Sequence, residues 1–255
     1  MPATAVLTFR NLVKNVRTPM LVIASVAQPL VWLVMFSQTF SRLADTPLLR
    51  GLCYRSYLAL LVPGMMVLAV LFTGLQSGLA MVSDIDSGML EKLRISPISR
   101  LSILLGRVLA DSVTMVAQGA VVLGVAALMG ARVETGWLGT FGMLASVALL
   151  GVVGASLANL IALRSRNAEL TMVAGIFVTL PALFLSPAFL PLRFQPDWVQ
   201  AVARVNPASY VIEVGQRLMS IGNDWGQDVR MLAVLAVAAL VLMPATVAAF
   251  RAATR

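Results

Sequence analysis

The chain has 255 residues, of which 59% are hydrophobic and only 12% charged, whereas a soluble globular chain is about a quarter charged. Its formal net charge is +8, but lysine and arginine lie at the ends of apolar runs, which favours topology signals and lipid contact over nucleic-acid binding. The single cysteine, Cys53, excludes an internal disulfide. The chain has no histidine, which argues against metal sites and histidine-based catalysis.

Six long stretches of the chain carry no charged residue. They lie between Arg17 and Arg42, Arg55 and Asp84, Asp111 and Arg132, Glu134 and Arg164, Glu169 and Arg193, and Arg230 and Arg251. Each has about 20 residues or more, roughly what a helix needs to cross ~30 Å of hydrocarbon. The sequence therefore predicts an all-α membrane protein with one domain over residues 1–255. The six predicted spans cover about 19–41, 57–82, 103–130, 138–162, 170–190 and 231–250.

The segment before the first span has helical periodicity. One face carries Ala5, Phe9, Leu12, Val13 and Val16, and the other carries Arg10, Lys14 and Arg17. This pattern predicts an amphipathic helix in the headgroup layer, with a plain cytoplasmic tail as the alternative.

Basic residues in the short loops predict the orientation. With the N-terminus inside, eleven of the 19 lysines and arginines are cytoplasmic. An even number of spans then places both termini, and the connection 83–100 between spans 2 and 3, in the cytoplasm.

The stretch "SDIDSGMLEKLRISPISR" (83–100) interrupts the apolar pattern with charged residues. Ser83 can cap a helix that has Asp84 and Asp86 in its first turn. Ile85, Met89 and Leu93 form an apolar stripe, and Ser96-Pro97 marks the start of the third span. We expect a short amphipathic cytoplasmic helix, which either docks in a partner's groove or lies on the membrane surface.

Within the spans, Asp111 is a candidate functional acid, although a local pair with Arg107, one turn earlier, is the favoured interpretation. Gln76 and Gln118 could line a path for cargo, or be satisfied between helices. Gly74-x-x-x-Gly78 would let a neighbouring helix approach closely.

The segment from about Pro187 to Asp228 is predicted to form a short helical hairpin at the outer face. "DWVQAVARV" favours one helix, and Asn206 followed by Pro207 favours the capped start of another. Glu213 and Arg217 have the spacing of a local ion pair.

Three stretches of the sequence resemble the corresponding parts of type 2 ATP-binding-cassette (ABC) exporter permeases. They are "DSGMLEKLRISPISR", "YLALLVPGMMVL" (57–68) and "FLSPAFLPLRFQPDWVQAVARVNPASYVIEVGQRL" (184–218), and the six-span layout also matches. In that family the loop corresponding to the first stretch forms a coupling helix that seats in the ATPase subunit. The resemblance implies coupling residues at Asp84, Asp86, Gly88, Met89, Leu90, Glu91, Leu93, Arg94 and Pro97.

The resemblance, to the daunorubicin-resistance, multidrug or lipid exporter branch, implies a plasma-membrane permease without enzymatic activity or a cofactor of its own. The chain has no Gly-x-x-x-x-Gly-Lys, so it cannot cradle ATP phosphates. ATP and Mg would bind two copies of a partner ATPase, and a second permease chain would complete a homo- or heterodimer among membrane lipids. A proton-driven secondary transporter is the alternative, and an intramembrane hydrolase ranks last.

Overall fold

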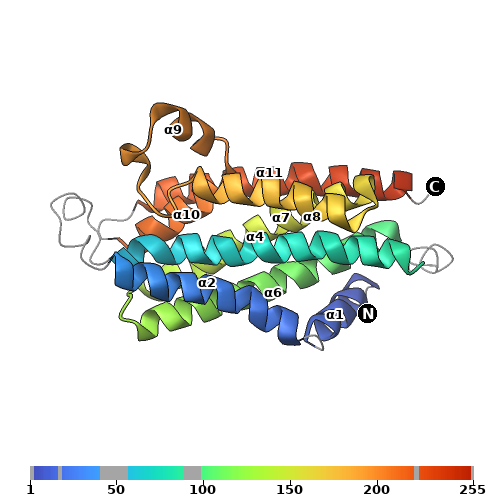
Figure 1. The fold of residues 1–255 in the computed structure, drawn as a ribbon, viewed down its shortest axis with the longest axis horizontal. Helices are drawn as coiled ribbons and strands as arrows, with labels where there is room; N and C mark the ends of the chain where they lie inside the picture. The colour runs from blue at the N-terminus through green and yellow to red at the C-terminus, as the bar shows by residue number, and fades with distance from the viewer. Residues whose placement is uncertain (1–2, 17–18, 41–56, 89–98, 221–223, 254–255) are drawn as a thin grey trace.

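The computed structural model describes residues 3–16, 19–40, 57–88, 99–220 and 224–253, and every regular element in these ranges is a helix (Figure 1). The α-helices are α1 (Ala3–Val16), α2 (Pro19–Thr39), α4 (Tyr57–Asp86), α6 (Arg100–Leu128), α7 (Gly136–Ser165), α8 (Ala168–Phe184), α9 (Asp197–Ala203), α10 (Pro207–Leu218) and α11 (Trp225–Ala253), with a 3-10 turn, η2 (Leu192–Phe194). The predicted all-α architecture is confirmed for the described residues.

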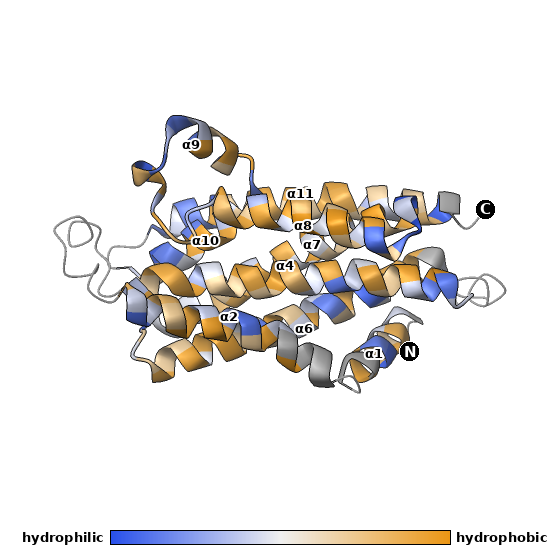
Figure 2. Ribbon diagram, in the orientation of Figure 1, coloured by the Kyte–Doolittle hydropathy of each residue, from blue (hydrophilic) through white to orange (hydrophobic). Residues whose placement is uncertain are grey.

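Four of the described helices, α4, α6, α7 and α11, are long and apolar enough to cross a membrane. Helix α8 is apolar but shorter, with 17 residues, and α2 has 21. Hydrophobic residues cover the middle of the bundle, and polar residues gather toward its two ends (Figure 2). The chain is therefore a multi-pass membrane protein, while the number of six spans stays a prediction.

Helix α4 forms the centre of the bundle and packs against α2, α6, α7, α8 and α10. Most of its apolar stretch is buried, whereas most of that of α11 is exposed. Exposed apolar side chains along α11, such as Leu240 and Val241, are what a helix facing lipid requires. The hydrophobic core thus lies around α4, and the exposed apolar side chains of α11 are suited to contact with lipid.

The close approach of α4 and α7 depends on small residues. A Cβ atom added to Gly78 would lie 2.9 Å from the carbonyl oxygen of Ala158, and one added to Gly74 would lie 3.4 Å from the carbonyl carbon of Gly154. The Gly74-x-x-x-Gly78 spacing therefore serves packing within the chain, as small residues do in membrane helices.

Helix α1 lies across one end of the bundle against α6. Leu7 is buried there, and Gly106 of α6 makes room for it, since a Cβ at Gly106 would lie 2.7 Å from the Leu7 Cβ. Phe9 is 70% exposed, and Arg10 is exposed as well. The predicted N-terminal helix is present, and its apolar exposure suits a headgroup layer.

Three predicted boundaries are shifted. Helix α4 continues to Asp86 instead of ending at residue 82, and α11 begins at Trp225 instead of residue 231. Helix α8 ends at Phe184 instead of residue 190, and turns follow it. The prolines that come next, Pro187 and Pro191, cannot donate the backbone hydrogen bonds that would continue a helix.

The two ends of the bundle differ in what they contain. The described chain ends, at Ala3 and Ala253, lie at the end where α4 finishes and α6 begins (Figure 1). Helices α9 and α10 lie at the opposite end. The two short helices predicted for this segment are therefore present, on the far side from both described chain ends.

Candidate functional site

An ion pair joins the end of α4 to α6. Nη1 of Arg107 lies 2.5 Å from Oδ2 of Asp84, and Nη2 donates to the backbone oxygen of Ser77, 3.0 Å away. The two charged side chains keep only 13% and 22% of their exposure, so water screens the pair less than it would at a surface. The contact lies immediately before the 89–98 connection.

A second set of contacts, one turn further along α6, joins three helices. Ser77 Oγ of α4 donates to Oδ2 of Asp111 on α6. Asn159 of α7 donates through Nδ2 to Ser77 Oγ at 3.1 Å and to the Ala155 oxygen at 2.7 Å. Ser77 and Asn159 are almost wholly buried, and Asp111 is 9% exposed. Ser77 is therefore the point at which α4, α6 and α7 are linked by polar groups.

A third layer links α4, α6 and α2. Thr73 Oγ1 donates to Oε1 of Gln118 at 2.7 Å, and Gln118 Nε2 donates to Oγ of Ser25 at 2.7 Å. Thr73 and Ser77 are four residues apart, so both lie on the same face of α4. We call the side chains of Asp84, Arg107, Ser77, Asp111, Asn159, Thr73 and Gln118 the polar column.

The structure corrects the expectation for Arg107 and Asp111. Arg107 crosses to Asp84 and to the Ser77 oxygen, and its Nε has no partner among the described residues. The expected local pair with Asp111 is therefore not formed, because the neighbouring helix offers a carboxylate in better reach. Gln118 belongs to the polar column, whereas Gln76 is exposed and points away from it.

The start of the expected coupling helix is also corrected. Ser83 does not cap a new helix, since Asp84 and Asp86 lie in the last turn of α4. The Ser87 N–H bonds to the Ser83 oxygen at 3.0 Å, and Gly88 has a positive φ of 66°. A glycine in the left-handed region ends helices without a Cβ penalty. Asp84 is therefore part of α4, whereas Gly88 lies beyond its end in a left-handed conformation, so the two are not in one helix.

The remaining predicted coupling residues lie outside the described residues: Met89, Leu90, Glu91, Leu93, Arg94 and Pro97. So does Ser96, which we expected to cap the third span. Helix α6 begins instead at Arg100, and its N-cap is Ser99, whose Oγ accepts from the Ser102 N–H at 3.1 Å.

The hairpin near α9 and α10 contains both predicted cap residues in their expected roles. Oδ1 of Asn206 accepts from the Ala208 N–H at 3.0 Å, and Pro207 is the first residue of α10. Nδ2 of Asn206 also donates to the Ala182 oxygen at 2.7 Å, so the cap residue ties α10 to α8.

The local ion pair expected between Glu213 and Arg217 is not formed, and Arg217 binds another carboxylate. Nε of Arg217 lies 3.1 Å from Oδ1 of Asp228, whose side chain is 3% exposed and belongs to α11. Glu213 is half-buried, and burial raises its pKa although the charge of Arg217 lowers it. The ion pair thus links α10 to α11 instead of stabilising one turn of α10.

Sequence reasoning missed Gln216 and Asp228. Gln216 Nε2 donates to the Leu60 oxygen at 3.1 Å and to the Pro187 oxygen at 2.7 Å, so it fastens α10 to the start of α4. No local pattern marks such a residue, because its partners lie more than 25 positions away in the sequence. In the described ranges no group of three or more histidine, cysteine, aspartate or glutamate side chains could hold a metal ion.

The comparisons with known proteins agree with this architecture. Residues 2–219 match the family described as "ABC-2 type transporter". The chain is 30% identical over 211 residues to ycf38 of Pyropia yezoensis, whose name describes it as a transport permease, covering 82% of this chain and 70% of that protein. It is 27% identical over 202 residues to "Daunorubicin resistance ABC transporter permease protein DrrB1" of Streptomyces coeruleorubidus, covering 79% of this chain and 69% of that protein.

A third relative is "Probable doxorubicin resistance ABC transporter permease protein DrrC" of Mycobacterium tuberculosis (strain CDC 1551 / Oshkosh). The chain is 25% identical to it over 210 residues, covering 82% of this chain and 74% of that protein. The family match spans α1 to α10, including both the polar column and the helical hairpin. From this match, supported by the all-helical apolar bundle, the chain belongs to the ABC-2 type transporter family and is an ABC transporter permease.

Proposed function

We propose that this permease exports lipophilic or amphipathic molecules, such as drugs, antibiotics or lipids, and that ATP hydrolysis on a separate subunit drives the export. Two relatives carry names of daunorubicin and doxorubicin resistance, which supports a cargo of this class. The four long described helices are mostly hydrophobic along their middle (Figure 2), which supports a path with largely apolar walls. Such a path suits cargo that partitions into the bilayer.

The proposed assembly has two ATPase subunits, which hold ATP and Mg, and a second permease chain that is identical or related. In this proposal α2 and α8 complete six spans together with the four longer helices. Both termini are cytoplasmic, in line with the basic residues of the short loops. The described chain ends, the last turn of α4 and the start of α6 lie at the same end of the bundle, which supports this arrangement.

The observation that carries the proposal is the position of the Asp84–Arg107 pair. It connects the last turn of α4 to α6 on either side of the connection that resembles a coupling loop. An ATPase that pushes this connection would move both helix ends, and the polar column would pass the shift to α7.

ATP-dependent export into inverted membrane vesicles that contain the permease and its ATPase tests the proposal. Gly88→Pro is expected to abolish coupled export, because proline cannot adopt the positive φ of Gly88. Glu91→Ala is expected to uncouple ATP hydrolysis from export. Glu169→Ala is the matched control, since Glu169 is exposed in the first turn of α8 at the same end of the bundle.

Normal ATP-dependent export by both Gly88→Pro and Glu91→Ala would contradict the proposal. Export that continues without ATP but stops when a protonophore collapses the proton gradient would favour a proton-driven transporter. In that case Asp111, buried between α4 and α6, would be the group to test as proton carrier.

A further inference from the structure

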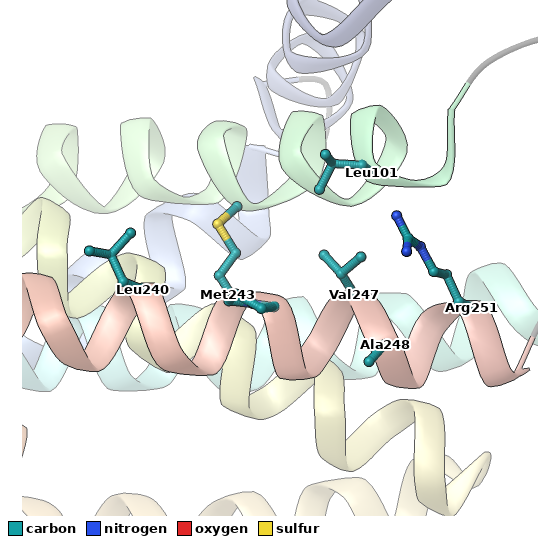
Figure 3. Close-up of a pocket in the computed structure, with 7 residues that line it drawn as sticks. Leu101, Leu240, Met243, Val247, Ala248 and Arg251 are labelled. Atoms are coloured by element: carbon teal, nitrogen blue, oxygen red, sulfur yellow. The ribbon is translucent and has the colours of Figure 1, made fainter.

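An apolar groove runs between α11 and α6 at the end of the bundle that contains both chain ends. Its cavity measures about 540 Å³. Met243 and Val247 rise from α11 toward Leu101 of α6, and Arg251 stands at the end of the row with its guanidinium beside the groove (Figure 3). Pro244 and Ala248 also line it. The groove is thus apolar along its length and has a cation at one end.

The length of the groove corresponds to one leaflet of a bilayer. Its lining on α11 extends from Leu240 to Arg251, which is about 16 Å along a helix that rises 1.5 Å per residue. Half of a ~30 Å hydrocarbon core is about 15 Å. Leu240 therefore lies near the depth of the bilayer midplane when Arg251 lies at the headgroups.

The width of the groove favours a slender occupant. A space of about 540 Å³ along about 16 Å of helix makes a narrow channel. A whole transmembrane helix, about 10 Å across, would lie over this channel and not within it. A hydrocarbon chain is the slender apolar group that a membrane supplies at this depth.

The charge at the groove's end selects the headgroup. Arg251 is exposed in the last turn of α11, and α6 begins at Arg100. The C-terminal end of a helix has a negative partial charge, so on α11 it is the guanidinium that attracts an anion. Arginine matches a phosphate with two parallel hydrogen bonds, and a lipid without a cationic headgroup group leaves that phosphate available.

We propose that this groove binds one acyl chain of an anionic phospholipid of the cytoplasmic leaflet, with the lipid phosphate held by Arg251. The placement in the cytoplasmic leaflet rests on the orientation in the proposed function. The site itself depends only on the groove and its arginine, and it is separate from the polar column and from any cargo path along it.

Native mass spectrometry of the full-length permease in detergent, titrated with phosphatidylglycerol or phosphatidylcholine, tests the site. Arg251→Gln is expected to weaken phosphatidylglycerol binding about fivefold, from about 1 kcal/mol per arginine near a headgroup, and to leave phosphatidylcholine binding unchanged. Arg251→Lys should keep most of the preference. Arg230→Gln, at the opposite end of α11, is the control and should bind like the unchanged protein.

A second pair of variants tests the groove without altering charge. Ala248 is exposed and lines the groove, so Ala248→Phe is expected to reduce binding of both lipids. Ala233→Phe places the same side chain on an exposed position of α11 outside the groove and should reduce neither.

Equal phosphatidylglycerol binding by Arg251→Gln and Arg230→Gln would overturn the proposal, and so would equal binding by the two phenylalanine variants. Ready disulfide formation between copies carrying Ala248→Cys in a Cys53→Ser background would show a second copy in the groove instead of lipid. Lipid binding requires neither ATP nor cargo, so its failure would leave the export proposal intact, and failed export would leave the lipid site intact.

Discussion

Asp84→Asn removes the charge from the carboxylate that binds Arg107 at the end of α4. A broken buried pair costs about 3–5 kcal/mol, and an exposed pair contributes about 0–1 kcal/mol. The two side chains are 13% and 22% exposed, which places this pair between those limits. We expect the free energy of unfolding to fall by about 2 kcal/mol, a change of about 30-fold in the folding equilibrium constant.

Asp86→Asn is the matched control, because Asp86 lies in the same last turn of α4 but is exposed. Its unfolding free energy should change by about 0.5 kcal/mol or less. Thermal unfolding of both variants in the same detergent, with intrinsic tryptophan fluorescence as the signal, measures the difference. The chain has four tryptophans for this purpose.

A double-mutant cycle with Arg107→Gln isolates the pair itself. If the ion pair accounts for the effect, the double variant should lose about as much unfolding free energy as either single variant. The coupling energy would then be about 2 kcal/mol. Equal stability of Asp84→Asn and Asp86→Asn, together with a coupling energy near zero, would refute the reasoning.

Two further predictions concern stability. Gly78→Ala should lower the free energy of unfolding by about 1–2 kcal/mol, because its Cβ would lie 2.9 Å from the backbone oxygen of Ala158. Gly154→Ala is the control in thermal unfolding and should be neutral or stabilising, because the new Cβ has open space around it in the described structure. Glu213→Gln should be more stable than the unchanged chain at pH 7. Burial raises the pKa of Glu213, so its stabilising protonated form is lost as pH rises through that pKa, and the advantage of the variant should vanish on titration below the pKa of an unfolded glutamate. A gap that does not depend on pH would contradict this.

The sequence was sufficient to predict the long helices among the described residues, but not the ends of several of them. Long uncharged stretches dictate helices because an apolar backbone in lipid must satisfy its own hydrogen bonds. The end of α4 was misplaced because Ser83 followed by Asp84 and Asp86 is equally typical of a helix start. In the structure Arg107 of another helix provides the charge that Asp84 needs at a helix C-terminus. That compensation is tertiary and leaves no local pattern.

The same reason explains the errors in the site. Spacing of four residues predicted pairs of Arg107 with Asp111 and of Glu213 with Arg217, yet each arginine binds a carboxylate on a different helix. In a bundle, a long side chain reaches a neighbouring helix as easily as its own next turn. Residue types identified Asp111 and Gln118 as candidates, but only the fold showed which partners they contact.

Helix α4 is held at both ends by contacts that a displacement would have to break or carry along. Near its start, Gln216 binds the Leu60 oxygen, and at its last turn Asp84 binds Arg107. Between these points the backbones of α4 and α7 are in close contact at Gly78. Moving one of these helices away from the other would therefore lose that packing. A push on the connection after Gly88 is therefore more easily accommodated by moving α4, α6 and α7 together than by bending α4. Such a rigid-body shift would carry α10 with it through Gln216, which links the end of the bundle facing the proposed ATPase to the opposite face.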